Sequence, residues 1–469
     1  MQLASGRGNV CASNANRMYI DHDTIIAPAT ASGGALTVIR LAGERAVEIA
    51  DHLFRGRHPM AETRSHTAHF GTICDGERVV DEVVATLFRA PHSYTGEDTV
   101  EFSCHGSSYI TAEVLRLALE AGARMAEPGE FTRRAYLAGR LDLSQAEAVA
   151  DLIASSSRAA HTLASHQMRG GYSSALDHLR EELLQLTALL ELELDFSEED
   201  VEFADRAQLD ATMAAIACEV ARLRSSFALG NAIKEGVAVA IVGAPNVGKS
   251  TLLNRLLNEE RAMVSEIAGT TRDVIEEQLT IDGVRFRILD TAGIRTTDDR
   301  LEQMGIERTR QSIERAQIVI WMVDATALDT TQPLPVPDFI LRPEQRLLSV
   351  INKADLYPHL VLPEPFLSIS AYTGCGIEAL RRALRAAVPT EALEEGAAIV
   401  SSARHYEALT IATEALQRAR HGLQEGLPTD LLSEEIRAVI VAIGSITGRG
   451  VILPDEVLQT LFSHFCIGK

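Results

Sequence analysis

The sequence predicts a multidomain protein: an N-terminal α+β domain, a helical domain, and an α/β domain with a mostly parallel sheet inserted into the helical one. Short β-rich runs alternate with helical stretches from about 21 to 138. Helical periodicity with few breakers covers 139–234 and returns over 389–469. Between them, 235–388 alternates buried-strand patterns with helices. Insertion at an exposed loop with adjacent ends is physically reasonable.

Length and composition limit the class of protein. The 469 residues suffice for two to four domains, and 46% apolar with 23% charged residues is a globular composition. No apolar run approaches the length of a transmembrane helix. Six scattered cysteines favour a reducing cytoplasm over a disulfide framework or a zinc site. Residues 1–20 lack the apolar stretch of a secretory signal and only faintly resemble a transit peptide, so we expect a disordered extension there, or a true start at Met18.

The charge of the chain restricts how it could meet nucleic acid. With a net charge of −21, contact with RNA requires a local basic patch or a partner protein. The most acidic stretch, Glu191–Glu202, contains seven carboxylates, and we interpret it as a solvated helix end or hinge rather than a metal site.

Each part contains its own recognisable elements. In the first part, 35–39 and 99–102 have strand patterns and 110–121 has a helical one. In the helical part, leucines at 179–186 recur at helical spacing.

Residues 243–251, Gly-Ala-Pro-Asn-Val-Gly-Lys-Ser-Thr, have the spacing of a phosphate-binding loop. Gly243 and Gly248 let successive N–H groups point toward phosphate oxygens. Lys249 adds a charge for the β- and γ-phosphates, and the Ser250 hydroxyl can ligate Mg²⁺. The run 237–242 reads as a buried strand and 251–257 as a helix whose N-terminus faces the anion.

Three further motifs follow in order, each after a predicted strand: 290–293 after 286–289, 352–355 after 347–351, and 370–371 after 366–367. Asn352 and Asp355 favour guanine, because a carboxylate accepts from the guanine N1–H and amine, a donor pair that adenine lacks. Asp290 takes the carboxylate position near Mg²⁺, and Thr270-Thr271-Arg272-Asp273 can supply the switch threonine. Together these predict a P-loop GTPase domain.

One position departs from the common GTPase pattern. Ras-like proteins have a water-orienting glutamine where this chain has Ile294, which cannot form a hydrogen bond. Either hydrolysis is very slow or another residue orients the water, with Asp298, Asp299 and Glu302 as the local candidates. Arg295 is also near, although a cation there is more often a surface residue than an arginine finger.

Several segments outside these motifs resemble the MnmE (TrmE) family of bacterial tRNA-modifying GTPases, and the resemblance runs from about Asp23 to Lys469. The segments are 23–27 (DTIIA), 94–98 (YTGED), 128–135 (PGEFTRRA), 141–148 (LDLSQAEA) and the terminal 465–469 (FCIGK).

The resemblance implies a function. It implies installation of an aminomethyl-type group (cmnm⁵ or nm⁵) at C5 of the wobble uridine, U34, of tRNA. A flavin-dependent MnmG (GidA) partner supplies FAD in a heterotetramer or larger complex. It also implies a homodimer, a cytoplasmic location without membrane contact, GTP with Mg²⁺ and K⁺, and a tetrahydrofolate one-carbon unit (5,10-methylene or 5-formyl) in the N-terminal domain, 21–138. G domains would pair when GTP is bound.

The motifs and the resemblance together assign residues to each role. Glu302 would orient the water in place of glutamine, with K⁺ in place of an arginine finger. Folate would contact Arg40, Glu101, Arg140 and Lys469. Mg²⁺ would be held by Ser250 and Thr271, and K⁺ by Asn246, Ser265, Ile267 and Thr270. The GTP-binding residues are Asn246, Val247, Gly248, Lys249, Ser250, Thr251, Ser265, Glu266, Ile267, Ala268, Gly269, Thr270, Thr271, Asp290, Thr291, Ala292, Gly293, Asn352, Lys353, Ala354, Asp355, Ser370, Ala371 and Tyr372.

Alternatives stay open at this point. Cys466 is either a buried structural cysteine or a residue of the modification chemistry, as nucleophile, proton donor or redox group. The whole chain could instead be an Era/Der-like regulatory or ribosome-assembly GTPase, or a scaffold without turnover. No two glycines lie three residues apart, which excludes a KH-type Gly-x-x-Gly clamp and favours modification over the Era/Der class.

Overall fold

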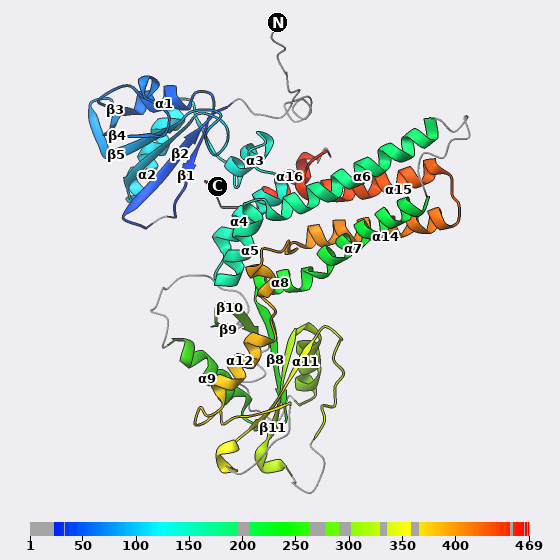
Figure 1. Ribbon diagram of the computed structural model, residues 1–469. Coiled ribbons are helices and arrows are strands. Elements are labelled where there is room, and N and C mark those ends of the chain that lie inside the picture. Colours follow the sequence, from blue (N-terminus) through cyan, green and yellow to red (C-terminus); the bar gives the residue numbers. More distant parts are fainter. Residues whose placement is uncertain are drawn as a thin grey trace. The chain divides into compact units, whose positions relative to one another are not determined.

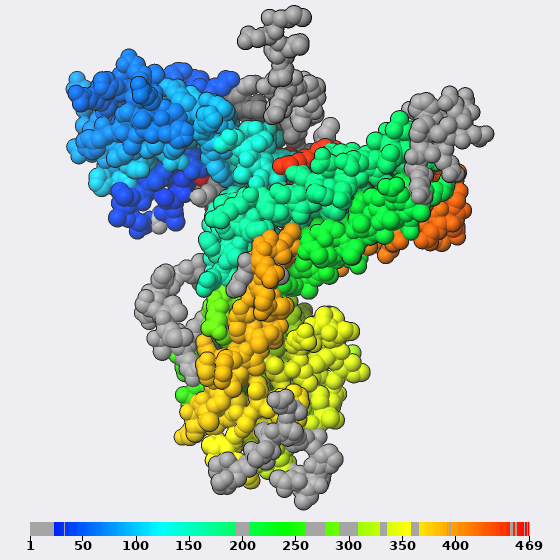
Figure 2. Space-filling model, in the orientation of Figure 1, coloured from blue at the N-terminus to red at the C-terminus, as the bar shows by residue number. Residues whose placement is uncertain are grey.

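A computed structural model describes residues 23–31, 33–195, 206–261, 277–289, 302–328, 335–357, 365–450, 454–463, 465, 466 and 468 (Figures 1 and 2). The chain divides by its contacts into two compact units. Unit 1 comprises residues 1–150, 173–206 and 418–469, and unit 2 comprises residues 151–172 and 207–417. The units group contacts more coarsely than the predicted domains, whose boundaries stay predictions. The extension at 1–20 lies outside the described residues.

Unit 1 contains a seven-stranded sheet in the order β3-β4-β5-β6-β2-β1-β7 (Figure 1). Neighbouring strands are antiparallel except β1 and β7. This sheet confirms the predicted strands at 35–39 and 99–102. The strands are β1 (Ile25–Pro28), β2 (Leu36–Ala42), β3 (Phe54–Gly56), β4 (Thr67–Asp75), β5 (Arg78–Phe88), β6 (Thr99–His105) and β7 (Arg124–Met125).

Two helices, α1 (Ala46–Leu53) and α2 (Ser108–Glu120), bury their apolar sides against one face of this sheet. The shared core includes Ile39, Phe102 and Val114, none of which is exposed. Period-2 alternation along the strands directs the other side chains to the opposite face. There Leu36 is 62% exposed, Phe70 68% and Val84 38%, so that face carries exposed apolar side chains.

A buried ion network explains the segment at 128–135. The Glu130 carboxylate has no solvent exposure and accepts from Arg124 (2.5 Å) and Arg134 (3.0 Å), and Asp23 pairs with both arginines. Burial raises the pKa of Glu130, but the hydrogen bonds from Arg124, the Glu127 N–H and Arg134 outweigh it, so the pKa is lowered overall. The network joins the start of β1, β7 and α3 (Glu130–Leu137).

The remaining helices of unit 1 include long ones that confirm the helical texture. The acidic stretch begins inside α6, where Glu191 pairs with Arg437 at 2.6 Å, and residues 196–205 lie outside the described part. Four of the described helices contribute residues to both units: α4 (Leu143–Ala154), α6 (Gly171–Asp195), α7 (Arg206–Ser225) and α14 (Ala403–Gln424). The helices are α4 (Leu143–Ala154), α6 (Gly171–Asp195), α15 (Thr429–Thr447) and α16 (Asp455–Ser463), with the short η2 (Met60–Glu62) after β3.

Unit 2 contains a six-stranded sheet in the order β13-β12-β11-β8-β10-β9, parallel except for the hairpin of β9 and β10. It confirms the mostly parallel sheet and the strands predicted around each motif. The strands are β8 (Val237–Gly243), β9 (Glu277–Ile281), β10 (Val284–Ile288), β11 (Ile318–Asp324), β12 (Arg346–Asn352) and β13 (Phe366–Ser368).

Helices cover both faces of this sheet, as two separate apolar clusters show. One packs Leu252, Leu256 and Leu380 against the strands, and the other includes Ile313 and Trp321. The helices of unit 2 are α5 (Arg158–Met168), α7 (Arg206–Ser225), α8 (Phe227–Glu235), α9 (Lys249–Arg261), α11 (Glu302–Arg315), α12 (Ile377–Ala386), α13 (Glu391–Glu394) and α14 (Ala403–Gln424), with η3 (Ala325–Ala327) and η4 (Ala354–Leu356).

Three features are absent from the residues that the structure describes: a membrane-spanning helix, a cluster of metal-binding side chains, and a disulfide bond. None of their helices is long and apolar enough to cross a membrane. They contain no group of three or more His, Cys, Asp or Glu side chains placed to hold a metal ion. Their cysteines all have free thiols: Cys74, Cys104, Cys218, Cys375 and Cys466.

Candidate functional site

The carboxyl edge of the unit 2 sheet gathers the predicted motifs. The phosphate-binding loop follows β8, Asn352 ends β12, and Ser370 follows β13. In the sheet, β8 lies between β10 and β11. The strands that follow β8 in the chain, β9 and β10, lie on one side of it, and the later strands β11 to β13 lie on the other side, so the order of strands reverses at β8. Ligands of open parallel sheets bind at such a reversal, outside the carboxyl ends of the strands.

The loop backbone requires its glycines. A Cβ at Gly243 would overlap the Met322 carbonyl oxygen, and a Cβ at Gly248, whose φ is +101°, would overlap the Asn352 amide nitrogen. Asn246 also has a left-handed conformation, with φ of +59°, which asparagine tolerates better than most residues. The close approach of neighbouring backbone thus explains the glycine spacing read from the sequence.

Lys249 lies over the loop. Its Nζ donates to the carbonyl oxygens of Gly243 and Ala244, each at 2.9 Å, and burial lowers the pKa of its ammonium group. Two neutral carbonyls compensate this half-buried cation only in part. Phosphate oxygens at this place would restore a full counter-charge, so the geometry suits an anionic ligand.

Asn352 joins two of the motifs. It is 3% exposed, its Nδ2 donates to the Val247 carbonyl at 2.7 Å, and its Oδ1 accepts from the Ala371 N–H at 2.9 Å. It therefore positions the phosphate loop against the loop at 370–371. Asp355, in η4, has an exposed side chain that can accept from a base.

Two positioning residues were missed by the sequence analysis. Asp324 ends β11 opposite Asn352 in register and pairs with the Lys353 ammonium at 2.6 Å. Arg255 of α9 donates to the Ala371 carbonyl at 3.3 Å and to the Tyr372 carbonyl. An acidic residue at the end of the strand next to β12 could have indicated Asp324, whereas nothing local distinguishes Arg255 from a surface cation.

Other predicted GTPase residues lie outside the described part: Ser265, Glu266, Ile267, Ala268, Gly269, Thr270, Thr271, Asp290, Thr291, Ala292 and Gly293, together with Ile294, Arg295, Asp298 and Asp299. Glu302 is the first residue of α11, but its side chain is outside the description. Their roles stay predictions.

Two of the four folate candidates lie together in unit 1. Arg40 and Glu101 face each other across β2 and β6, with Nε and Oε1 2.8 Å apart. The Arg40 guanidinium lies 5.2 Å from the Tyr94 ring centre and 5.5 Å from that of Phe131. Arg140 is exposed, and its side chain runs beside Gly96.

The C-terminal segment packs in the same unit. A Cβ at Gly468 would overlap the Pro28 carbonyl oxygen at the end of β1, and the Gly129 N–H donates to the Cys466 carbonyl at 3.4 Å. Cys466 is exposed, so the interpretation as a buried structural cysteine is wrong. By contrast, burial raises the pKa of Cys104 to about 12, which keeps it a thiol. Lys469 lies outside the described residues.

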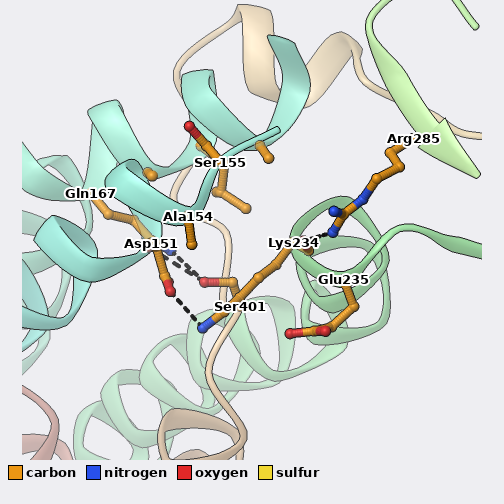
Figure 3. Close-up of a pocket in the computed structure, with 11 residues that line it drawn as sticks. Asp151, Ala154, Ser155, Gln167, Lys234, Glu235, Arg285 and Ser401 are labelled. Carbon is orange, nitrogen blue, oxygen red and sulfur yellow. Dashed lines mark hydrogen bonds and ion pairs between the residues drawn. The ribbon is translucent and has the colours of Figure 1, made fainter. Parts of the chain in front are cut away.

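A cavity of about 260 Å³ occurs elsewhere in unit 2 (Figure 3). Lys234 of α8 pairs with Asp151 at 2.8 Å on its wall, and Gln167 donates to Ser401 at 3.2 Å. Arg285 of β10 donates to the Lys234 carbonyl at 2.8 Å. Its polar groups mostly satisfy one another and none belongs to a predicted motif, so we interpret it as a packing cavity beside the nucleotide domain.

Two family models together match most of the chain. The family model "GTP-binding protein TrmE N-terminus" matches residues 24–140, and "MnmE helical domain" matches 143–466. A "tRNA modification GTPase MnmE" of Bacteroides fragilis is 48% identical over 467 residues, covering 96% of this chain and 100% of the relative. The one of Flavobacterium psychrophilum has the same identity and coverage.

Solved structures add little. Era in complex with MgGDPNP and nucleotides of 16S ribosomal RNA is 28% identical over 38% of this chain and 65% of that chain, with a TM-score of 0.22, which supports no conclusion. The matches over nearly the whole length decide against the Era/Der alternative, since they cover the N-terminal and helical parts as well. The chain belongs to the MnmE family of tRNA modification GTPases.

Proposed function

We propose that this chain is the GTP-hydrolysing component of a cytoplasmic system that installs an aminomethyl-type group (cmnm⁵ or nm⁵) at C5 of the tRNA wobble uridine, U34. The tRNA part rests on the relatives, which are named for tRNA modification. The observation that carries the GTPase part is the Asn352 side chain, which joins the phosphate loop to the loop at 370–371.

The nucleotide would lie across the carboxyl edge of β8 and β12. The phosphate-loop N–H groups and Lys249 would contact its phosphates, Ser250 and Thr271 would hold Mg²⁺, and Asp355 would accept from guanine. Lys249 and Ser250 lie on the first turn of α9 and Asp355 lies in η4, which supports this proposal.

Hydrolysis would use a cation rather than an arginine finger. Asn246 and the backbone or side chains of Ser265, Ile267 and Thr270 would hold K⁺, and Glu302 would orient the water. Asn246 is exposed on the loop and has a left-handed conformation, so its side-chain oxygen is accessible to a cation, which supports this role. Pairing of two G domains would complete the site.

The residues in unit 1 fit a tetrahydrofolate. One edge of a pterin carries N–H donors, and a carboxylate such as Glu101 can accept hydrogen bonds from them. The pterin ring is flat, so it could pack against the aromatic rings of Tyr94 and Phe131, which lie near Arg40. Cationic Arg140 and Lys469 suit the glutamate tail. When bound, 5,10-methylenetetrahydrofolate or 5-formyltetrahydrofolate would supply a one-carbon unit, and Cys466, exposed near the chain end, is the candidate for chemistry at that unit.

The proposed function also implies two kinds of protein partner, a second copy of this chain and a flavin-dependent protein. We propose a homodimer, and the exposed Leu36, Phe70 and Val84 on the open face of the unit 1 sheet favour one formed there, since such apolar faces usually meet another surface. FAD would come with a flavin-dependent MnmG (GidA)-type partner in a heterotetramer or larger complex.

Nucleoside analysis tests this function. Bulk tRNA from a deletion strain should lack the modified wobble uridine, and the unaltered gene should restore it while an Asp355→Ala gene should not. Asn254→Ala, a change at an exposed position on α9, is the matched control and should restore it. Normal wobble uridines in the deletion strain would refute the proposal.

A further inference from the structure

One edge of the unit 1 sheet is basic although the chain as a whole is strongly acidic. Residues 52–70 contain three arginines, four histidines and one carboxylate, Glu62, against a net charge of −21 for the chain. The exposed members form what we call the β3–β4 edge patch: Arg55, Arg57, His58, Arg64 and His66. It lies on β3, the terminal strand of the sheet, and on the loops that join β3 to β4 (Figure 1).

The charges of this patch are not neutralised by carboxylates. Within the described part of the chain, Arg55, Arg57 and Arg64 form no ion pair, and the Arg55 Nη2 donates to a neutral acceptor, the Gly76 carbonyl, at 2.6 Å. Arginines elsewhere in unit 1 behave differently. Arg78, for example, pairs with Asp75 and Glu113, and Arg418 pairs with Glu435. The patch therefore presents a net positive field.

The nearest acids that the structure describes form no ion pair with the patch arginines. The Asp51 carboxylate is occupied by the backbone, since it accepts from the N–H groups of Met60 and Ala61. Asp75 is shared between Arg78 and Arg116, at 2.9 and 2.8 Å. Among the described residues, Glu62 is exposed in the same loop, Glu77 is exposed next to Gly76, and Glu82 is exposed two strands from Arg55 in register. None of these three described carboxylates forms an ion pair with the patch.

The loop that carries the patch is held from beneath. Met60 is fully buried, and Arg89 donates to the Ala61 carbonyl at 2.9 Å while its other nitrogen pairs with Asp98 at 3.0 Å. Further along, the His66 ring meets the Phe88 ring edge to face at 5.4 Å. Because the loop backbone is already ordered, a ligand that binds there does not have to fix it, and less conformational entropy is lost on binding. The backbone that carries the arginines is therefore preorganised.

We propose that the β3–β4 edge patch binds the sugar-phosphate backbone of tRNA. Arginine guanidinium groups recognise phosphate with two parallel N–H groups, and histidine rings can stack on unpaired bases. A row of phosphates matches several unpaired cations on an edge better than a single small anion does. The inference rests on the proposed function and names the surface by which an acidic protein holds its polyanionic substrate.

The position of the patch suits this role. The Arg40–Glu101 pair lies on the same sheet, with β6 three strands from β3. At about 4.8 Å per strand, the lateral separation is roughly 15 Å. This is less than the width of an RNA duplex, so one RNA could contact the patch with its backbone while a base approaches the folate candidates.

Salt-dependent binding tests the patch. The probe is a fluorescent tRNA transcript with uridine at the wobble position, and the protein is the full chain. Each phosphate contact contributes about 0.7–0.9 to the slope of log K against log salt. The triple variant Arg55→Gln/Arg57→Gln/Arg64→Gln should therefore have a slope smaller by about 2–3. Between 50 and 200 mM salt, the unaltered chain should lose about 20- to 40-fold more affinity than the variant.

Two further variants control the experiment. Arg57→Gln/Arg64→Gln leaves the Arg55 bond to Gly76 in place and should reduce the slope by about 1.4–1.8, which covers the case in which the triple variant fails to fold. Arg169→Gln/Arg346→Gln/Arg382→Gln changes the net charge equally at exposed arginines of unit 2 that pair with no described carboxylate. It should keep the unaltered slope.

Several results would overturn the inference. They are an unchanged slope in both patch variants, an equal loss in the unit 2 control, or no measurable tRNA binding by the unaltered chain at 50 mM salt. Binding to phosphatidylcholine–phosphatidylserine vesicles that falls in the patch variants while the tRNA slope stays would assign the surface to membranes instead. None of these results alters the wobble nucleosides of a deletion strain, which decide the proposed function separately.

Discussion

Replacing Asn352 with alanine removes the side chain that joins the two nucleotide loops. The change deletes two hydrogen bonds, to the Val247 carbonyl at 2.7 Å and from the Ala371 N–H at 2.9 Å. Both partners are backbone groups of buried residues. Leaving a buried polar group without a partner costs about 1–3 kcal/mol, so the two together would cost about 2–6 kcal/mol if both stayed dry.

The expected loss lies at the lower end of that range. Alanine leaves a space beside the phosphate loop, and water entering from the exposed positions 244–246 can satisfy part of the need. A cost of about 2–3 kcal/mol corresponds to an affinity about 30- to 150-fold weaker. The two loops contact parts of the nucleotide that GTP and GDP share, so the affinities for GTP and for GDP should fall by the same factor. The rate of GTP turnover at saturating GTP should change little.

Equilibrium titration with fluorescent GDP and GTP analogues measures this loss, and circular dichroism melting reports whether the G domain unfolds. Asn254→Ala on α9 is the control, since Asn254 is exposed and the change removes the same atoms. Affinities of Asn352→Ala that stay within about threefold of the unaltered chain would refute the reasoning, because they would show that the two loops hold their places without the bridge.

Four further predictions concern separate steps. Glu302→Ala should abolish GTP hydrolysis while GTP affinity stays nearly constant, and an unaffected rate would remove Glu302 from the mechanism. Turnover should be faster in K⁺ than in Na⁺ buffer, and equal rates would contradict a cation in place of an arginine finger. Asp355→Asn should weaken GTP and strengthen XTP binding, since xanthine has a carbonyl where guanine has its amine; an unchanged preference in competition binding would oppose the base contact. The pKa of Glu130 is lowered in the folded state, so its stabilisation holds above the unfolded pKa of about 4.3 and is lost as pH falls through the folded value. Melting of Glu130→Gln should therefore depend less steeply on pH between about 6 and 3 than that of the unaltered chain, and parallel curves would argue against the network.

The sequence predicted the local elements of the nucleotide domain because their signals are local. The strand at 237–242, the loop after it and the helix that begins at Lys249 lie within 25 consecutive residues, where periodicity and glycine spacing carry the information. The folate candidates Arg40 and Glu101 were placed by family resemblance, and their pairing depends on β2 lying beside β6, which no local pattern records.

The residues that tie the site together escaped prediction for a physical reason. Arg255 reaches the Ala371 carbonyl across 116 positions of sequence, and Lys353 meets Asp324 across 29. A side chain with such a distant partner has the same local pattern as an ordinary surface charge, so only the order of strands in the sheet reveals the contact. The exposure of Cys466 was likewise unpredictable, because a small thiol suits either environment.

The phosphate loop and the guanine motif form one packed unit rather than two neighbouring ones. Gly248 has no Cβ at the point where the Asn352 amide nitrogen approaches, and the same nitrogen donates to the preceding carbonyl of the loop, that of Val247. A side chain at 248 would therefore displace the residue that holds 370–371, in addition to straining a backbone with φ of +101°. The second glycine of the loop is therefore required by its contact with Asn352 as well as by the backbone conformation of the loop itself.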